Sequence, residues 1–197
     1  MAPKNSADST RERILAAAKT EFADHGIAGA RVDRIAKEAR TSKERVYAYF
    51  TSKESLYRLV TAQELAAAAE AARLDAADLP GYAGRIHDYF TAHPECYRLM
   101  IWGRLELRAE NAAADDPVRD SVTGKIEKLR RAQEAGLLDT TWEPIDILIM
   151  LNQIAVSWVD QADHAPAGPA ERAAFMSDRR AAVVAAVERL FPAATSG

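Results

Sequence analysis

One stretch decides the fold of this 197-residue chain: Thr41-Ser42-Lys43-Glu44-Arg45-Val46-Tyr47-Ala48-Tyr49-Phe50. Val46 and Phe50 are four residues apart and share one face of a helix, whereas most of the charged and aromatic side chains between them lie away from it. The opening Thr-Ser-Lys-Glu recurs at residues 51–54, and each copy has the form of a capping box, which begins a helix. The stretch therefore predicts a short helix over residues 42–49 that presents charged and aromatic groups to its surroundings.

Two helices are expected before this stretch and a long one after it. Ser9-Thr10-Arg11-Glu12 has the form of a capping box for the first helix, and Gly26 supplies its left-handed end. Apolar residues at positions 32, 35, 36 and 39 predict a second helix over residues 31–39, followed by a turn of about three residues. The second Thr-Ser-Lys-Glu copy begins a helix that runs without a breaker through the Ala-rich residues 65–72. This arrangement predicts a helix–turn–helix domain over residues 8–54.

The rest of the chain is also expected to be helical. Apolar residues recur at helical spacing nearly everywhere, and no stretch alternates as a strand between turns does. Proline and glycine breakers divide the chain after Leu79 into about five further helices. The sequence therefore predicts an all-α protein of about nine helices, with a larger helical domain over residues 55–192.

The composition excludes several classes of protein. With 48% hydrophobic and 28% charged residues, the chain has the make-up of an ordinary globular protein. The longest charge-free stretch, residues 147–159, is shorter than the roughly 20 apolar residues of a membrane span. The first residues lack the apolar region of a secretion signal, and the single Cys96 cannot form an internal disulfide. We therefore expect a cytoplasmic protein that is not in a membrane.

Basic residues are concentrated in the N-terminal part of the chain. Residues 1–60 contain 12 Lys and Arg against 8 Asp and Glu, whereas residues 61–197 contain 14 against 21. Seven basic and three acidic residues fall within residues 31–53. A polyanion is a suitable partner for this segment, although so small an excess of charge is also compatible with a solvated surface.

Residue types that support catalysis or metal binding are not found at the spacings that these functions need. The four histidines lack the i, i+4 spacing of a helical zinc site, and no glycine-rich phosphate loop is present. His93 and Cys96 bring an imidazole near a thiol, but a buried structural cysteine is the commoner case. We therefore expect no catalytic residue, no metal and no cofactor, and predict that the protein is not an enzyme.

The helix–turn–helix carries side chains suited to DNA. A helix that enters a major groove brings its N-terminus near the phosphate backbone, where Thr41, Ser42 and Lys43 can bind phosphate oxygens. The planar guanidinium of Arg45 can bind both O6 and N7 of guanine, so we expect Arg45 to contact a base. Tyr47 and Tyr49 can donate to phosphate or contact thymine methyl groups.

Residues 10–60 resemble the N-terminal domain of the tetracycline-repressor (TetR) family. The resemblance is carried by Ile14-Leu15-Ala16-Ala17-Ala18, Phe22, Gly26, Ile35-Ala36-Lys37-Glu38-Ala39, the stretch 41–50 and Ser52-Lys53-Glu54-Ser55-Leu56. It implies that the short helix lies in the major groove and that Val46 and Phe50 belong to the core. It also implies DNA contacts, mostly to phosphates, by Ser42, Lys43, Arg45, Tyr47, Tyr49 and Lys53.

Three positions depart from the family's pattern. Arg40 and Glu44 stand where glycines are usual, and a left-handed conformation at Arg40 would cost about 1–2 kcal/mol. Glu44 would oppose DNA phosphate unless its carboxylate turned back to cap the helix. Arg31 replaces the usual Thr or Ser before the second helix, and we expect it to reach phosphate.

The two last predicted helices, residues 144–162 and 170–190, are the most apolar of the chain. This favours a homodimer interface formed by the pair, with a plain core role as the alternative. The family resemblance implies, in the same domain, a pocket whose ligand releases DNA. Candidate pocket residues recur at helical spacing and are also compatible with plain core: Tyr89, Phe90, Met100, Trp102, Leu105, Met150, Ile154 and Trp158. The nearby acids Asp88, Glu106 and Asp146 leave the charge of the ligand open.

Together these observations predict a sequence-specific, DNA-binding transcriptional regulator. We expect a homodimeric repressor that binds a near-palindromic double-stranded operator and is released from it by a small-molecule effector. One alternative is a DNA-binding regulator without an effector. The other is an enzyme acting on a small apolar molecule, whose activity would depend on His93 or Cys96.

Overall fold

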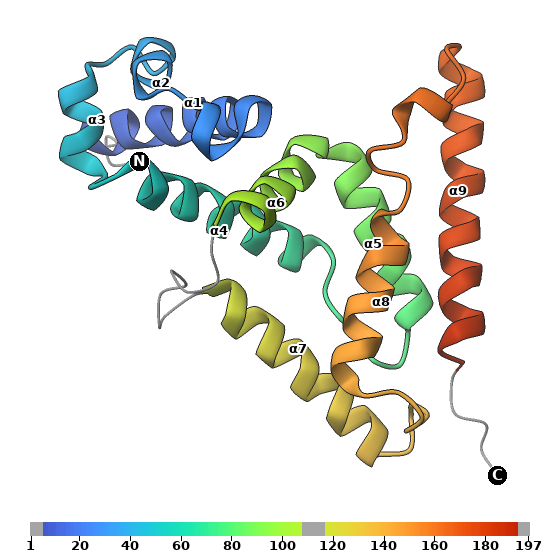
Figure 1. Ribbon diagram of the computed structural model, residues 1–197. Helices are drawn as coiled ribbons and strands as arrows, with labels where there is room; N and C mark the ends of the chain where they lie inside the picture. Colours follow the sequence, from blue (N-terminus) through green and yellow to red (C-terminus); the bar gives the residue numbers. More distant parts are fainter. Residues whose placement is uncertain (1–5, 108–116, 193–197) are drawn as a thin grey trace. The chain divides into compact units, whose positions relative to one another are not determined.

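The computed structural model describes residues 6–107 and 117–192, which form nine α-helices joined by loops (Figure 1). The helices are α1 (Ser6–Gly29), α2 (Val32–Glu38), α3 (Lys43–Tyr49), α4 (Lys53–Ala71), α5 (Leu79–Ala92), α6 (Pro94–Glu106), α7 (Pro117–Glu134), α8 (Pro144–Val156) and α9 (Pro169–Leu190). A 3₁₀ turn covers Ala162–His164. The predicted all-α class with about nine helices is confirmed.

The chain divides into two compact units, and the boundary falls within α4. The first unit contains the residues up to Ala66 together with α6 from Glu95 onward. The second contains Ala67–Pro94 and the chain from α7 to the end of α9. The unit that holds the helix–turn–helix thus includes two helical segments that lie outside the predicted 8–54 domain.

The core of the first unit is built around α1. Ile14 and Phe22 of α1 are fully buried, as are Ile35 of α2 and, almost completely, Val46 of α3. Phe22 packs edge to face against Tyr57 of α4, with ring centroids 5.3 Å apart. Each such buried side chain contributes roughly 1.5–3 kcal/mol, so this apolar core holds α2 and α3 in fixed orientations on α1.

Helix α1 begins and ends differently from the sequence prediction. It starts at Ser6, so Ser9 lies inside the helix, and the Ser9 hydroxyl accepts a hydrogen bond from Arg13 rather than capping. The predicted capping box at Ser9 is therefore wrong. Gly26 has the expected positive φ, 68°, but the chain kinks there and remains helical to Gly29.

Both Thr-Ser-Lys-Glu copies begin helices, but in each the serine is the capping residue instead of the threonine. The Ser42 hydroxyl accepts from the Arg45 amide at 3.2 Å. At α4, the Ser52 hydroxyl accepts from the Ser55 amide and the Ser55 hydroxyl accepts from the Ser52 amide, both at 3.0 Å. The reciprocal pair of a capping box thus forms at α4 with Ser55 in the position expected for a glutamate.

In the second unit, α5 packs against both α8 and α9, and α7 packs against α8 (Figure 1). Tyr82 of α5 and Leu151 of α8 are fully buried, and His87 is buried with its Nδ1 3.2 Å from the carbonyl oxygen of Ala155. Helix α8 ends at Val156, short of the predicted residue 162, whereas α9 spans almost the predicted 170–190. The second unit is therefore a helical bundle in which α8 packs against α5, α7 and α9.

Candidate nucleic-acid interface

The turn between α2 and α3 has the geometry of a Schellman motif. Thr41 donates its amide to the carbonyl of Ala36 at 2.9 Å, and Arg40 donates to Lys37 at 3.1 Å. Arg40 has a φ of 52°, the left-handed conformation that this motif requires and that glycine usually supplies. Arg40 is exposed, so the strain is not offset by packing of its side chain. The left-handed conformation considered from the sequence is therefore present.

The N-terminus of α3 is capped by its own residues. Ser42 is the N-cap, with its hydroxyl on the Arg45 amide. The Glu44 carboxylate bonds to its own backbone amide and to the Ser42 hydroxyl, and these bonds lower the pKa of Glu44. Its charge is therefore turned back toward the helix end, the arrangement that reduces repulsion of a phosphate.

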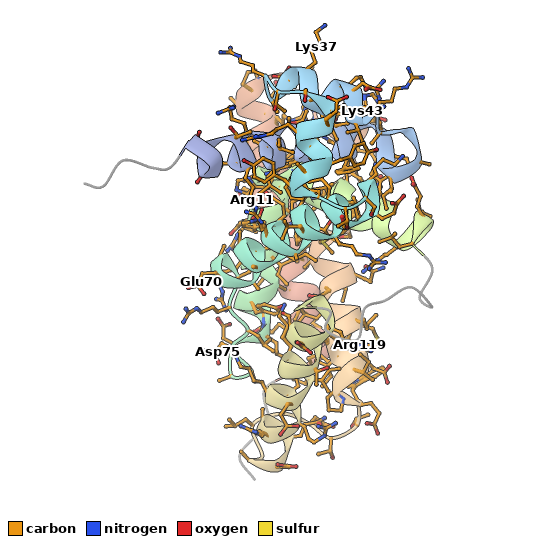
Figure 2. All side chains as sticks on the ribbon, turned by 90° about the vertical axis from the view of Figure 1, so that its left-hand side faces the viewer. Arg11, Lys37, Lys43, Glu70, Asp75 and Arg119 are labelled. Atoms are coloured by element: carbon orange, nitrogen blue, oxygen red, sulfur yellow. The ribbon has the colours of Figure 1, made fainter. Side chains whose placement is uncertain are left out.

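Helix α3 is exposed along most of its length, with Val46 as its buried residue. Tyr47 is 45% exposed, and the Arg45 guanidinium lies 5.5 Å from the centroid of the Tyr49 ring. The Lys43 ammonium lies 3.2 Å from a carboxylate oxygen of Asp33 on α2. Figure 2 faces this helix and shows Lys43 on the outer surface of the unit. Such a row of cationic and phenolic groups on one helix can bind a polyanion.

Lys53 and Arg31, which are also predicted to contact DNA, hold α1 and α2 in place. The Lys53 ammonium lies 3.2 Å from the Ala28 carbonyl and 3.3 Å from that of Ala30, at the end of α1. Arg31 is exposed and donates its backbone amide to Glu21 at 2.8 Å, which leaves its side chain directed to solvent. To bind a phosphate, the Lys53 ammonium must therefore leave these carbonyls or keep one of these hydrogen bonds while it binds the phosphate.

An ion pair between a buried carboxylate and an exposed arginine fixes α2 on α1. Glu21 is only 9% exposed, and its carboxylate lies 2.6 Å from Arg34 and also accepts from the Arg31 amide. Burial raises the pKa of Glu21, but the hydrogen bonds from Arg34 and Arg31 outweigh it, and the pKa falls below the usual 4.5. The charged pair thereby orients the first turn of α2.

The structure adds Lys37 and Arg40 to the exposed cations next to α3. Both are exposed at the C-terminal end of α2, and Figure 2 shows Lys37 pointing away from the unit. The sequence signal was the basic excess within residues 31–53, but only the turn geometry brings the end of α2 beside the start of α3. Neither was among the predicted contacts of the interface.

Helix α6 is bound to α1 within the first unit. Arg98 and Trp102 both donate to the carbonyl of Ala23, each at 3.2 Å, and Glu106 accepts from the Ala28 amide. A side chain at Gly26 would approach Trp102 to 2.9 Å, so the kink is also a close contact with α6. Movement of α6 would therefore act directly on the end of α1.

The predicted ligand-pocket residues are divided between the units. Met100, Trp102 and Leu105 lie in the first, and Leu105 is 70% exposed while Trp102 bonds to α1. The second unit holds Tyr89, Phe90, Met150, Ile154 and Trp158. Phe90 is buried against Tyr89, and Trp158 packs against Phe175 with ring centroids 5.8 Å apart. These contacts assign several candidates a packing role.

The acids near these candidates have partners or lie at the surface. Asp88 forms an ion pair with Arg180 at 2.8 Å, Glu106 accepts from Ala28, and Asp146 is exposed in the first turn of α8. An acid already bound to a cation or an amide is poorly placed to attract a cationic ligand. This weakens the interpretation of these acids as a ligand-binding group.

The thiol considered as a nucleophile is in an unreactive state. Cys96 is buried, and burial first, then the nearby Glu64, raises its pKa to about 12. The thiol is therefore protonated at neutral pH. Within residues 6–107 and 117–192, no three His, Cys, Asp or Glu side chains gather as a metal site, and no helix is long and apolar enough to cross a membrane.

Two family descriptions match the chain in sequence. "Bacterial regulatory proteins, tetR family" matches residues 14–60, the region that contains α2, α3 and the interface described above. "Tetracyclin repressor-like, C-terminal domain" matches residues 78–189, which is more than half of the chain.

Individual proteins are similar over most of the chain. The transcriptional repressor SCO4008 of Streptomyces coelicolor is 36% identical over 148 residues, 75% of this chain and 77% of its own. The structure of SCO4942, described as a transcriptional regulator of the same organism, is 53% identical with a TM-score of 0.78, covering 93% of this chain and 98% of its own. The structure of a TetR-family regulator from Pseudomonas syringae is 23% identical with a TM-score of 0.64, covering 93% of this chain and 97% of its own. At this identity the similarity concerns the fold alone.

Proposed function

This chain belongs to the TetR family and is a DNA-binding transcriptional regulator, and from that premise we propose how its residues bind an operator and release it. The observation that carries the proposal is the form of α3. Its only buried residue is Val46, its N-terminus is capped by Ser42, and its exposed face carries Lys43, Arg45 and Tyr47, together with Glu44, whose carboxylate is turned back to the helix end. A short helix of this kind fits a major groove, with its N-terminal end toward the bases or backbone.

We assign the contacts by their chemistry. Thr41, Ser42 and Lys43 lie at the N-terminus of α3 and bind phosphates, with Arg31, Lys37 and Arg40 of the neighbouring turns adding charge. The Lys43–Asp33 pair is exposed and therefore contributes at most about 1 kcal/mol, so a phosphate can replace Asp33. Lys53 binds phosphate from the start of α4. Arg45 reads a base, because its fork can bind guanine at two points once it leaves the Tyr49 ring.

The family acts as dimers on operator DNA, and we propose that α8 and α9 form the dimer interface here. Ile145 and Ile149 of α8 are 41% and 50% exposed and lie one turn apart on one face. On α9 the exposed Ala174, Ser177 and Ala181 are small and allow another helix to approach closely. Two copies joined there would present two α3 helices to half-sites about 34–36 Å apart, or a multiple of a helical turn, on a near-palindromic operator.

We propose that an effector in the second unit controls DNA binding through α4 and α6. Helix α4 belongs to both units, and α6 contacts the end of α1 through Arg98, Trp102 and Glu106. A ligand that favours a different arrangement of these helices would change the separation of the two α3 helices. Equal separations in the ligand-bound and DNA-bound proteins would contradict this mechanism.

The test is selection of bound duplexes from a random DNA pool, followed by measurement of affinity against salt concentration. We expect an enriched near-palindrome bound with a steep negative dependence of affinity on salt. The matched control is the Arg45→Ala protein carried through the same selection. A folded dimer of the unaltered protein that enriches no sequence would contradict sequence-specific binding.

A further inference from the structure

Helix α7 places a lysine where its inward face should be apolar. Val122, Leu129 and Ala132 lie at the spacing of one helical stripe, and Leu129 and Ala132 are buried. Lys125 lies on the same stripe, between Val122 and Leu129, and is itself partly buried. The other lysine of the helix, Lys128, is exposed. A charged residue in the buried stripe is uncommon unless something pairs with it.

The side chain of Lys125 is directed at Tyr82 of α5. Its ammonium lies 5.9 Å from the centroid of the Tyr82 ring, and among the described residues no acid forms an ion pair with it. Burial, and then the charge of Lys128, lower the pKa of Lys125. Both effects oppose the charged form, and an anion beside the ammonium would relieve them.

Tyr82 supplies a second group that lacks a partner. The residue is 0% exposed, and its hydroxyl makes no hydrogen bond within the part of the chain that the structure describes. A buried hydroxyl without a partner is destabilising, so such groups mark places where a water or ligand completes the bonding. The Tyr82 hydroxyl thus lacks a hydrogen bond, and the neighbouring Lys125 ammonium has the face of the Tyr82 ring, not an anion, as its partner.

We propose that Lys125 and Tyr82 bind the anionic group of the effector, so that the effector is a small apolar molecule carrying a negative charge. This rests on the proposed effector control of DNA binding and adds the chemical class of the effector. The ammonium pairs with the anion and the Tyr82 hydroxyl donates to it, which gives the hydroxyl a hydrogen bond and the ammonium a counter-charge. Of the three acids that would have suited a cationic effector, Asp88 is engaged by Arg180, Glu106 is engaged by Ala28, and Asp146 is exposed in the first turn of α8.

The experiment compares two fluorescent probes with nearly the same apolar body on the full-length protein. 1-Anilinonaphthalene-8-sulfonate is an anion, and N-phenyl-1-naphthylamine is its neutral counterpart. We expect saturable binding of the anion, weakened about tenfold by Lys125→Met and severalfold by Tyr82→Phe. Binding of the neutral probe should change by less than about twofold in either variant.

The matched control is Lys128→Met, which removes the same charge from the exposed face of α7. It should leave the affinity for the anionic probe within about twofold of the unaltered protein. Both Met and Phe are compatible with buried positions, and unfolding curves recorded alongside will identify any variant that has lost its fold. Decanoate and 1-naphthoate are tested as competitors of the anionic probe, which separates chain-like from aromatic anions. Decan-1-ol is the uncharged counterpart of decanoate.

The proposal would be overturned if the anionic probe did not bind saturably, or if Lys125→Met weakened the binding of both probes equally. It would also be overturned if Lys128→Met weakened the binding of the anionic probe as much as Lys125→Met does. Displacement of the probe by decan-1-ol as effective as by the carboxylates would have the same meaning. DNA binding is measured separately on the same proteins without a probe. Failure of the unaltered protein to bind DNA would contradict the proposed function. Intact DNA binding with no selectivity for the anionic probe would contradict only the proposed class of effector.

Discussion

Single residues at the interface combine strain with charge. Arg40 closes the turn between α2 and α3 in a left-handed conformation, at a position where glycine would be unstrained. Lys43, Arg45 and Lys53 are each engaged within the protein, by Asp33, by Tyr49 and by carbonyls at the end of α1. The Lys43–Asp33 contact is exposed and weak, so a phosphate can replace it, whereas Lys53 is only partly exposed.

Substitution of Arg40 by glycine is expected to stabilise the protein. Removal of the left-handed strain exceeds the entropic penalty of glycine, so Arg40→Gly should raise the free energy of unfolding by roughly 0.5–1 kcal/mol. Urea unfolding of the purified protein measures the change. Lys37→Gly, inside α2, is the control and should destabilise by about 1 kcal/mol. A loss of stability in Arg40→Gly would show that the Arg40 side chain compensates for its own strain.

Arg45 and Lys43 should differ in how their loss affects DNA binding. Arg45→Ala is expected to cost about 1–3 kcal/mol on the selected operator and little on unrelated DNA. Lys43→Ala should weaken binding to all sequences and reduce the salt slope by about one. Fluorescence anisotropy on both duplexes over a range of salt concentrations separates the two patterns. Equal loss on both duplexes with Arg45→Ala would exclude it as a base reader.

Elements are held in place by contacts between neighbouring helices. The Glu21–Arg34 pair orients α2 on α1, and the kink at Gly26 allows α1 to contact α6. Because α3 is short and buries only Val46, its position depends on α1 and α2 more than on its own packing. Changes at Glu21 or Gly26 therefore act on α3 without touching it.

The Glu21–Arg34 pair should make stability depend on pH in the acid range. The folded pKa of Glu21 is below the unfolded value of 4.5, so its contribution is fully present above that value and is lost as the pH falls through the folded pKa. Glu21→Gln should lower the free energy of unfolding by about 1–3 kcal/mol at pH 7, and the difference should shrink as the pH falls below 4.5. Urea unfolding of both proteins from pH 7 to pH 3 measures it. A difference that stayed constant over this range would exclude titration of Glu21.

Gly26 should be intolerant of a side chain. An alanine there would be strained by the φ of 68° and would meet Trp102 and Glu106 of α6. We expect Gly26→Ala to lower the free energy of unfolding by more than about 2 kcal/mol. The control is Gly29→Ala, whose new methyl group would lie 3.5 Å from His25, an ordinary contact. Equal effects of the two substitutions would contradict the close approach of α1 and α6.

At the scale of the whole molecule, function requires two copies of the chain. One α3 presents one short helix with seven residues to DNA, whereas a two-fold dimer doubles the contacts and imposes a fixed spacing. In the proposed interface, the exposed isoleucines of α8 are the apolar surface for this association. Operator affinity should therefore depend on residues far along the chain from the helix–turn–helix.

Charge on the exposed face of α8 should break the dimer and with it tight DNA binding. Ile149→Glu places a carboxylate where the two-fold axis would bring a second carboxylate close, so we expect a monomer at micromolar concentration. Light scattering after gel filtration measures the mass, and anisotropy measures the loss of operator affinity. Thr123→Glu, on the exposed face of α7, is the control and should remain dimeric. A dimeric Ile149→Glu protein would place the interface elsewhere.

Local spacing in the sequence determined the class of the fold and the position of the short helix α3. The apolar stripes, the repeated Thr-Ser-Lys-Glu and the spacing from Tyr47 through Phe50 to Leu56 depend on residues within a few turns of one another. Such patterns predict helices and their exposed faces because helix formation is local. They failed at helix ends: α1 begins before Ser9, and serines rather than threonines cap α3 and α4.

Only the tertiary structure decided which distant residues meet. It brought α6 against the end of α1, divided the predicted pocket residues between two units, and set Lys125 facing Tyr82. Lys125 and Tyr82 are far apart in the chain, and nothing local marks either as unsatisfied. Packing decides whether a polar group finds a partner, because burial and hydrogen bonding depend on all neighbouring elements at once.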